Sequence, residues 1–314
     1  MMEKTIKQLN ATERRDTAGS VIGLVSKWFF YAVLVIYCLS LLVPLIWMIF
    51  TAFKGYTEYY ENMFLWPKKW IFENFPSAFE KLKIQAPVYK GDRQVATIEY
   101  GIFNMISTSL IWSLSTASIH VLCTALVAYV MARYEFFGRK FLYTLGIFIM
   151  ITPIIGNTPS MMIVRKSLGI YNNMFLTILT QNSTCFSGLH FLILYGAFGS
   201  LPKSYSEAAE VDGAGHYTIL LKIMLPMMLP TCAVIFVLSF LTHWNEYGTF
   251  LIWLPSYANL AFGMYQFQQD AAYYGANINE IMAGFCLAII PSATLYIASQ
   301  KVVMSKFTVG GLKG

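Results

Sequence analysis

Long apolar runs alternate with short polar segments along most of the 314 residues, and six of these runs have helical character. A helix needs about 20 residues to cross a hydrocarbon core of roughly 30 Å, and each of the six runs is that long. The pattern predicts six membrane-spanning helices, over residues 28–53, 102–131, 141–164, 174–198, 227–253 and 281–304. We therefore expect an all-α, polytopic membrane protein.

Composition and charge support this class and suggest an orientation. The mean hydropathy is +0.55 and only 12% of the residues are charged. Most of the 22 Lys and Arg residues lie in the N-terminal tail and in segments that six crossings place on the same side as the tail. We expect a cytoplasmic tail over 1–27, a transmembrane domain over 28–314 with a first outside loop over 54–101, and both termini in the cytoplasm.

Several kinds of chemistry are absent from the sequence. The basic residues are scattered among helix ends without aromatic platforms, so nucleic acid is not an expected partner. The five cysteines and four histidines show no metal-ligand spacing, and His120 and His190 are predicted to be separate packing residues on apolar helices. No zinc motif, nucleophile elbow or phosphate-binding loop occurs. We expect no enzyme activity, and no metal or cofactor bound by this chain.

A polar segment over 199–226 stands out from its apolar surroundings. Ser204 and Glu207 have the spacing of a capping box, which predicts the start of a short helix with Ser204 as N-cap. Asp212-Gly213 is a turn signal, and Gly213 allows a positive φ. A second short helix is predicted over about 217–224, before Pro226. The result is a helix-turn-helix along the membrane surface, which either docks a partner or is an ordinary surface loop.

The residues of this segment resemble the Glu-Ala-Ala loop found in permease subunits of bacterial ABC importers. The matching positions are Glu207-Ala208-Ala209, Asp212-Gly213-Ala214, Ile223, Leu225-Pro226 and Pro230. Further segments resemble carbohydrate-uptake permeases of the maltose-transporter type, and together the similarity covers about residues 28–314. These segments are Phe103-Asn104, Ser107, Ser109, Ala128 to Tyr134, Phe137 to Lys140, His243 to Tyr247, Gln300-Lys301, Phe307 and Gly310 to Gly314.

This resemblance implies a non-catalytic subunit in the bacterial cell membrane that forms half of a translocation pathway for a carbohydrate, in particular an oligosaccharide. The implied partners are a second homologous permease in a heterodimer, two ATPase subunits that hold ATP and Mg²⁺, an extracellular solute-binding protein, and membrane lipid. The residues implied to couple this chain to the ATPase are Glu207, Ala208, Ala209, Asp212, Gly213, Ala214 and Pro226.

The resemblance also covers Trp244, Asn245, Glu246 and Tyr247, near the end of the fifth predicted span. A carboxylate inside a span is costly and usually faces a cavity or a partner helix, so these four residues are candidates for the substrate pathway. Alternatively, Glu246 reaches the outer interface and Asn245 bonds across helices.

Two segments depart from the family pattern. Residues 81–100 form a polar insertion, which is either a small extracellular contact element or an idle insertion. The loop 254–280 is rich in aromatic residues that stack on sugars or anchor the chain at the membrane interface. A self-sufficient channel or secondary transporter remains the alternative function, but it leaves the polar segment 199–226 without a partner.

Overall fold

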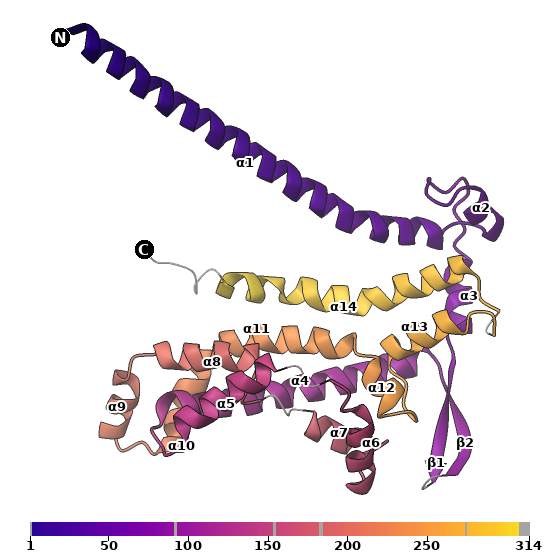
Figure 1. Ribbon diagram of the computed structural model, residues 1–314. Coiled ribbons are helices and arrows are strands. Elements are labelled where there is room, and N and C mark those ends of the chain that lie inside the picture. Colours follow the sequence, from indigo (N-terminus) through magenta and orange to yellow (C-terminus); the bar gives the residue numbers. More distant parts are fainter. Residues whose placement is uncertain (1, 91–92, 153–154, 182–184, 274, 308–314) are drawn as a thin grey trace.

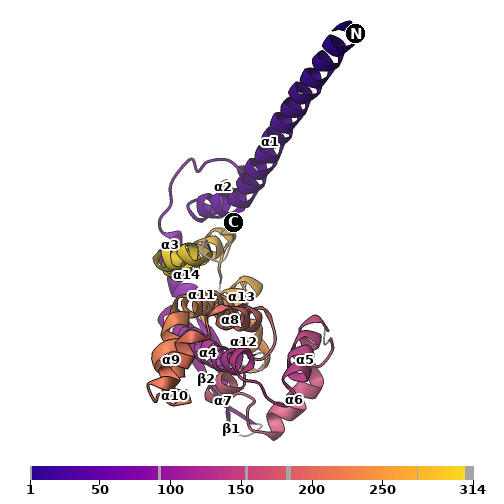
Figure 2. The ribbon, with the colours of Figure 1, turned by 90° about the vertical axis from the view of Figure 1, so that its left-hand side faces the viewer.

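The protein is built almost entirely from helices, as Figures 1 and 2 show. The computed structural model describes residues 2–90, 93–152, 155–181, 185–273 and 275–307. In chain order the elements are α1 (Met2–Ala52), α2 (Tyr56–Glu61), α3 (Asn74–Lys81), β1 (Ile84–Lys90), β2 (Arg93–Tyr100), α4 (Ile102–Arg133), α5 (Arg139–Ile151), α6 (Thr158–Ser167), α7 (Met174–Thr180), α8 (Leu189–Ser200), α9 (Ser204–Val211), α10 (His216–Ile219), the π-helical turn η1 (Leu220–Met224), α11 (Leu225–Trp244), α12 (Gly248–Ile252), α13 (Leu260–Gln269) and α14 (Ile278–Phe307).

Within these described ranges, four helical segments are long and apolar enough to cross a membrane. They are Leu24–Ala52, Ile102–Arg133, His216–Trp244 and Ile278–Ala298. They correspond to the first, second, fifth and sixth of the predicted spans. The membrane class and the mainly helical fold are therefore as the hydropathy pattern predicts.

The other two predicted spans, 141–164 and 174–198, are each divided into two shorter helices. In the first, Thr152 precedes a proline and is extended (φ −82°, ψ 112°), as that position favours, and Gly156 then takes a positive φ of 80°. In the second, α7 and α8 are separated by a polar stretch, and Gly188 has a φ of 93° before α8. Average hydropathy does not register such breaks, because a few turn residues barely change it.

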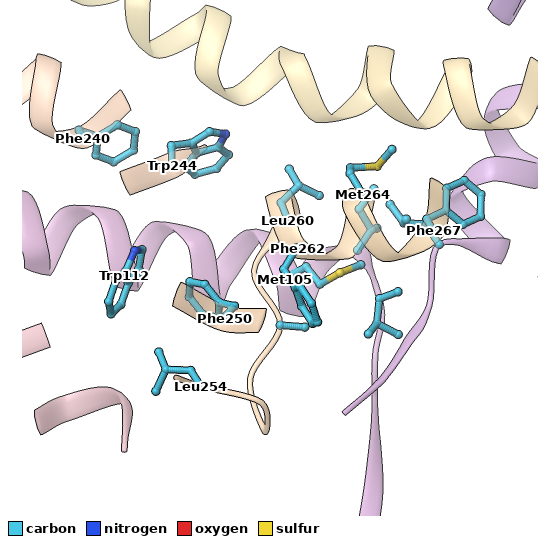
Figure 3. Packing of buried hydrophobic residues seen from close by; sticks show 14 of the residues in the cluster. Met105, Trp112, Phe240, Trp244, Phe250, Leu254, Leu260, Phe262, Met264 and Phe267 are labelled. Carbon is cyan, nitrogen blue, oxygen red and sulfur yellow. The ribbon is translucent and has the colours of Figure 1, made fainter. Parts of the chain in front are cut away.

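The centre of the molecule is the long helix α4, which packs against α8, α11 and α13. One apolar core lies around the first half of α4, where the rings of Trp112 and Phe250 meet edge-on at 5.3 Å (Figure 3). Phe262 and Phe267 of α13 belong to this core and are at most 9% exposed. The prediction that the aromatic residues of 254–280 stack on sugars or anchor in lipid is therefore wrong for these two, since they pack inside the protein.

Helix α1 leaves the rest of the molecule, as both views show (Figures 1 and 2). It packs against α14 at its C-terminal end only. Its apolar side chains from Leu24 to Val43 are exposed on every face. So much apolar surface requires lipid or another membrane helix as its cover.

The insertion after α3 is a β-hairpin, so the all-α prediction is wrong for residues 84–100. Strands β1 and β2 pair antiparallel from Ile84 opposite Tyr100, with a bulge between Val88 and Tyr89. The insertion does not hang free, because Ser256 in the loop before α13 donates its hydroxyl proton to the carbonyl of Pro87 on β1. The hairpin is thus fixed to the segment that enters α13.

A set of polar contacts joins α1, α3 and α14 at the same end of the molecule. The Glu280 side chain is only 7% exposed and accepts bonds from Lys81 Nζ at 2.8 Å to each carboxylate oxygen. The Ser77 hydroxyl also bonds Glu280. Asn279 donates to the carbonyl of Thr51 in α1 at 2.9 Å. These bonds hold the C-terminal end of α1 against α14.

Two of the histidines meet inside the helix bundle. His120 of α4 and His190 of α8 are joined by a hydrogen bond of 3.0 Å between ring nitrogens. The expectation that each packs separately is corrected, because residues 70 positions apart become neighbours only when α4 and α8 pack. Their role as packing residues between helices is as predicted.

Candidate functional site

The polar segment 199–226 forms a bent element at the far end of α4 from the hairpin (Figure 1). Helix α9 starts at Ser204, as the sequence predicts, but its N-cap is Lys203 and no side chain caps it. The predicted N-cap role of Ser204 is wrong because Pro202, with its fixed φ, lets the chain become helical one residue earlier. Ser206 donates instead to the Lys203 carbonyl at 2.8 Å.

The turn after α9 depends on Gly213, which has a φ of 81°. Its backbone N–H bonds the Glu210 carbonyl and the Ala214 N–H bonds the Ala209 carbonyl, so the turn closes the end of α9. A positive φ at this position is what the Asp-Gly pair predicts. Gly213 and its neighbour Asp212 are both exposed.

The helix that follows the turn does not stop before Pro226. Helix α10, the π-helical turn η1 and α11 run on as one helical segment from His216 to Trp244. Pro226 lies inside this continuous segment, two residues after the π-helical turn, which is a local adjustment that lets a helix continue past a proline, and it is exposed. The prediction of a separate second helix is therefore corrected. The bent element is continuous with a membrane-length helix.

The coupling candidates divide between buried and exposed positions. Ala209 is 8% exposed and packs in a second apolar core with Ile219 and Met224. Glu207 and Ala208 are exposed on α9, and Ala214 is half-buried beyond the turn. The small residue Ala209 therefore lets α9 lie close to the start of the long helix, while Glu207 points to the surface.

A polar cavity of about 440 Å³ lies between α9 and the end of α4. Its lining includes three basic and three acidic side chains: Arg133, Arg139, Lys203, Glu135, Glu207 and Glu210. In the part of the chain that the structure describes, none of the six forms an ion pair with another. Arg133 instead donates to the Leu201 carbonyl at 2.8 Å, which ties α4 to the segment before α9.

Large apolar side chains stand on both sides of the Gly213 turn without cover. Val211 is 89% exposed and Tyr217 is 83% exposed. Two such side chains beside charged groups that lack ion pairs are typical of a surface that binds another protein.

A second candidate site lies at the other end of α11. A cavity of about 290 Å³ is bordered by the end of α11, by α13 and by α14. Its lining includes Trp244, Asn245 and Tyr247, three of the four pathway candidates. Trp244 is only 3% exposed and stacks on Phe240 at 5.7 Å, so it forms a wall of the cavity.

Glu246, the fourth pathway candidate, is not in the lining of this cavity. Its carboxylate accepts from the Thr249 backbone N–H at 3.1 Å, at the start of α12. Its carbonyl accepts from Asn259 at 2.7 Å. Glu246 therefore fixes the chain between α11 and α13. The alternative expectation was that Asn245 bonds across helices. In the described part of the chain, its side-chain amide instead donates to the Leu241 carbonyl of its own helix at 2.9 Å.

Sequence reasoning did not connect three residues of the second cavity with the end of α11, although Tyr265 belongs to the aromatic segment 254–280 that was a candidate for stacking on sugars. Tyr265 and Gln268 come from α13 and Ser292 from α14. Spacings of i, i+3 and i+4 relate Tyr265 to Gln268 on one helical face, but no sequence signal relates them to Tyr247. Only the packing of α13 against α11 and α14 brings them together.

The fold is that of a helical membrane protein with an exposed bent element at one end. The family described as "Binding-protein-dependent transport system inner membrane component" matches residues 121–309, more than half of the chain, and the protein belongs to this family. It is therefore a permease component of a binding-protein-dependent transport system.

The chain is similar to permease proteins of other bacteria, including a sugar permease. The chain is 28% identical to the probable ABC transporter permease protein YurM of Bacillus subtilis, over 93% of this chain and 90% of the relative. It is 26% identical to the diacetylchitobiose uptake system permease protein NgcG of Streptomyces coelicolor, over 89% and 87%. A bacterial ABC transporter that imports the acidic polysaccharide alginate has the same fold, with a TM-score of 0.68, 18% identity, and coverage of 90% of this chain and 96% of that chain.

Proposed function

We propose that this chain is a transmembrane permease subunit of an ATP-driven importer and forms half of the pathway for an oligosaccharide. The observation that carries the proposal is the bent element α9–Gly213–α10, which is continuous with a membrane-length helix and exposes Val211 and Tyr217. Family membership and relatives named as permeases for diacetylchitobiose, galactooligosaccharides and maltodextrin support it.

We further propose six crossings, in which the interrupted pairs α5–α6 and α7–α8 supply the third and fourth. The N-terminal end of α1, the C-terminal end of α14 and the bent element all lie toward one end of the molecule (Figure 1). An even number of crossings is consistent with that placement. This end is the cytoplasmic one under the charge bias of the sequence.

The exposed surfaces indicate the partners. The uncovered length of α1 fits a second, homologous permease and lipid. The bent element fits an ATPase subunit, one for each permease, which holds ATP and Mg²⁺. A solute-binding protein delivers the sugar at the opposite end, where the hairpin lies. One solved alginate importer is described in complex with a binding protein that carries an alginate pentasaccharide.

The geometry suggests how motion passes from the ATPase to the pathway. Because α10, η1 and α11 form one helical segment from His216 to Trp244, a displacement of the bent element moves the far end of α11 as well. That far end carries Trp244, Asn245 and Tyr247 at the second cavity. ATP binding and hydrolysis on the partner thus shift the population between two arrangements of this cavity.

The proposal is tested by purifying the tagged chain from its native membrane in mild detergent and identifying every polypeptide that accompanies it. Val211→Glu places a charge in the exposed apolar contact, and Val95→Glu makes the same change on β2 at the other end, where the side chain is 58% exposed. We expect an ATPase and a second permease with the parent chain and with Val95→Glu, and loss of the ATPase alone with Val211→Glu.

Two results contradict the proposal. Recovery of the chain alone, or only as a homo-oligomer, favours a self-sufficient channel or secondary transporter. Equal recovery of the ATPase with Val211→Glu and with the parent chain removes the bent element as the docking surface.

A further inference from the structure

We propose that the cavity between α11, α13 and α14 is a sugar subsite that this subunit itself supplies, and that it selects an uncharged sugar unit. The inference rests on the proposed function, because it names the substrate class of the pathway described above. It adds Gln268 and Ser292, which sequence reasoning did not find, and it places Tyr265 of the aromatic segment 254–280 beside Tyr247. It also gives a reason for discrimination against acidic glycans.

Two stacked tyrosine rings form an aromatic platform in the lining of the cavity. The rings of Tyr247 and Tyr265 stack at 4.8 Å between centroids and 16° between planes. Tyr265 stacks on Tyr247, and Tyr247 is still 43% exposed, which leaves part of this residue accessible to a ligand. The C–H face of a sugar ring packs on such an aromatic face, while the phenol oxygens bond its hydroxyls. A pair of stacked rings also holds the platform in one orientation.

The lining of the cavity also contains neutral side chains that can form hydrogen bonds. Asn245 uses its amide N–H on the Leu241 carbonyl, which leaves its side-chain oxygen as an acceptor. Ser292 donates to the Ile289 carbonyl at 2.9 Å, which leaves its hydroxyl oxygen as an acceptor. Gln268 is exposed and makes no bond among the described residues, so both its donor and its acceptor are open. Sugar hydroxyls match this set, because each donates one proton and accepts others.

The charge of the cavity lining bears on which sugars it can bind. Among the residues that the structure describes, the lining of the cavity contains no Asp, Glu, Lys, Arg or His. The nearest carboxylate in sequence, Glu246, is bonded to the Thr249 backbone N–H instead. A uronate entering the cavity would lose part of its hydration without meeting a cation, which is unfavourable. An uncharged sugar unit has no such penalty, so the lack of a cation in the cavity disfavours acidic sugar units relative to neutral ones.

The volume limits how much of a substrate fits. At about 290 Å³ the cavity is at the lower end of ligand sites, which span roughly 300–1,000 Å³. It therefore holds a single unit of a longer chain. A lipid tail fits the apolar wall of Trp244 and Met264 but offers no hydrogen bond to the side-chain oxygen of Asn245 or to the amide of Gln268, so a sugar is the better occupant.

The test uses the complete transporter, co-purified with its partners and reconstituted in proteoliposomes with its binding protein. Uptake is measured with labelled maltotriose, diacetylchitobiose, galactobiose and digalacturonate as probes. Tyr265→Ala, Tyr265→Phe and Gln268→Ala alter the subsite, and Tyr273→Ala is the control, since Tyr273 is 76% exposed and outside the lining. Gln268→Lys adds a cation for the acidic probe.

We expect the parent transporter to prefer a neutral probe. Tyr265→Ala removes the ring that orients Tyr247 and should lower kcat/KM for that probe by roughly three- to tenfold, the size of one aromatic pair contact, while Tyr265→Phe retains the stacking and most of the uptake. Gln268→Ala lowers it as well, and Gln268→Lys raises uptake of digalacturonate relative to the neutral probes. Tyr273→Ala behaves as the parent chain.

The failures of the two proposals are distinguishable. If the parent complex contains no ATPase or takes up none of the probes in an ATP-dependent way, the proposed function is wrong and this inference fails with it. If uptake is ATP-dependent but Tyr265→Ala, Gln268→Ala and Gln268→Lys all match the parent in rate and in preference, only the subsite is wrong. A parent transporter that prefers digalacturonate also overturns it.

Discussion

The turn at Gly213 gives the most quantitative prediction, because the cost of replacing this glycine has one identifiable source. A Cβ built on Gly213 meets no atom within 4 Å, so Gly213→Ala creates no clash. The φ of 81° is the whole penalty, and the left-handed conformation costs an alanine about 1–2 kcal/mol. The strain in the folded turn is then on the order of 1 kcal/mol.

This strain acts on docking if the free turn relaxes and the docked turn does not. About 1 kcal/mol corresponds to a roughly fivefold weaker association between this chain and the ATPase. Gly213→Asn should be milder than Gly213→Ala, since asparagine enters the left-handed region more easily, and Gly213→Val should be worse. Gly215→Ala is the matched control, because Gly215 has a φ of −75° and its added Cβ also meets nothing within 4 Å.

The assay titrates the purified ATPase onto the detergent-solubilised permease pair and reads ATP hydrolysis that depends on the sugar-loaded binding protein. We expect docking to weaken in the order Gly, Asn, Ala, Val at position 213. Strain at Gly213 is refuted as the cause if Gly215→Ala weakens docking as much as Gly213→Ala does. It is also refuted if the Ala and Asn variants at position 213 dock as strongly as the parent chain with glycine.

Two further predictions concern the opposite end of the molecule. Lys81→Met leaves the nearly buried Glu280 without its cation and should lower the free energy of unfolding by about 2–3 kcal/mol. Lys83→Met is the control, because its partner Glu99 is about half exposed, and it should cost less than about 1 kcal/mol. Thermal unfolding of the purified complex compares the two variants, and equal effects would contradict the structure. Ser256→Ala removes the bond to β1 and should speed amide hydrogen exchange in the hairpin without changing exchange in α4, and unchanged exchange in β1 would show that this bond does not hold the hairpin.

Much of the fold is predictable from the sequence because it depends on local patterns. The long apolar runs give four membrane-length helices, and the Asp212-Gly213 pair gives a turn with positive φ. The hairpin had a detectable signal as well. Residues 84–90 and 93–100 flank a Gly-Asp pair, a dipeptide typical of hairpin loops, although the hydropathy pattern by itself predicts only helices.

The remainder depends on packing between distant segments, which no local pattern encodes. The bond between His120 and His190 joins residues 70 positions apart. Tyr247 and Tyr265 stack only because α13 folds back beside α11. The same limit applies to Glu246. A carboxylate in an apolar run suggests a pathway residue, and only the position of Thr249 shows that it fixes a turn.

The π-helical turn η1, between the bent element and α11, has a consequence for how such proteins diverge. A π turn holds about one residue more than an α turn for the same rotation about the helix axis, so η1 accommodates an extra residue without changing the direction in which the bent element points. Deleting one residue from Leu220–Met224 should therefore give an ordinary α turn and leave α9 and α11 in nearly the same relative orientation. A residue gained or lost elsewhere between His216 and Trp244 is not absorbed in this way and would rotate the bent element by about 100° relative to the far end of α11.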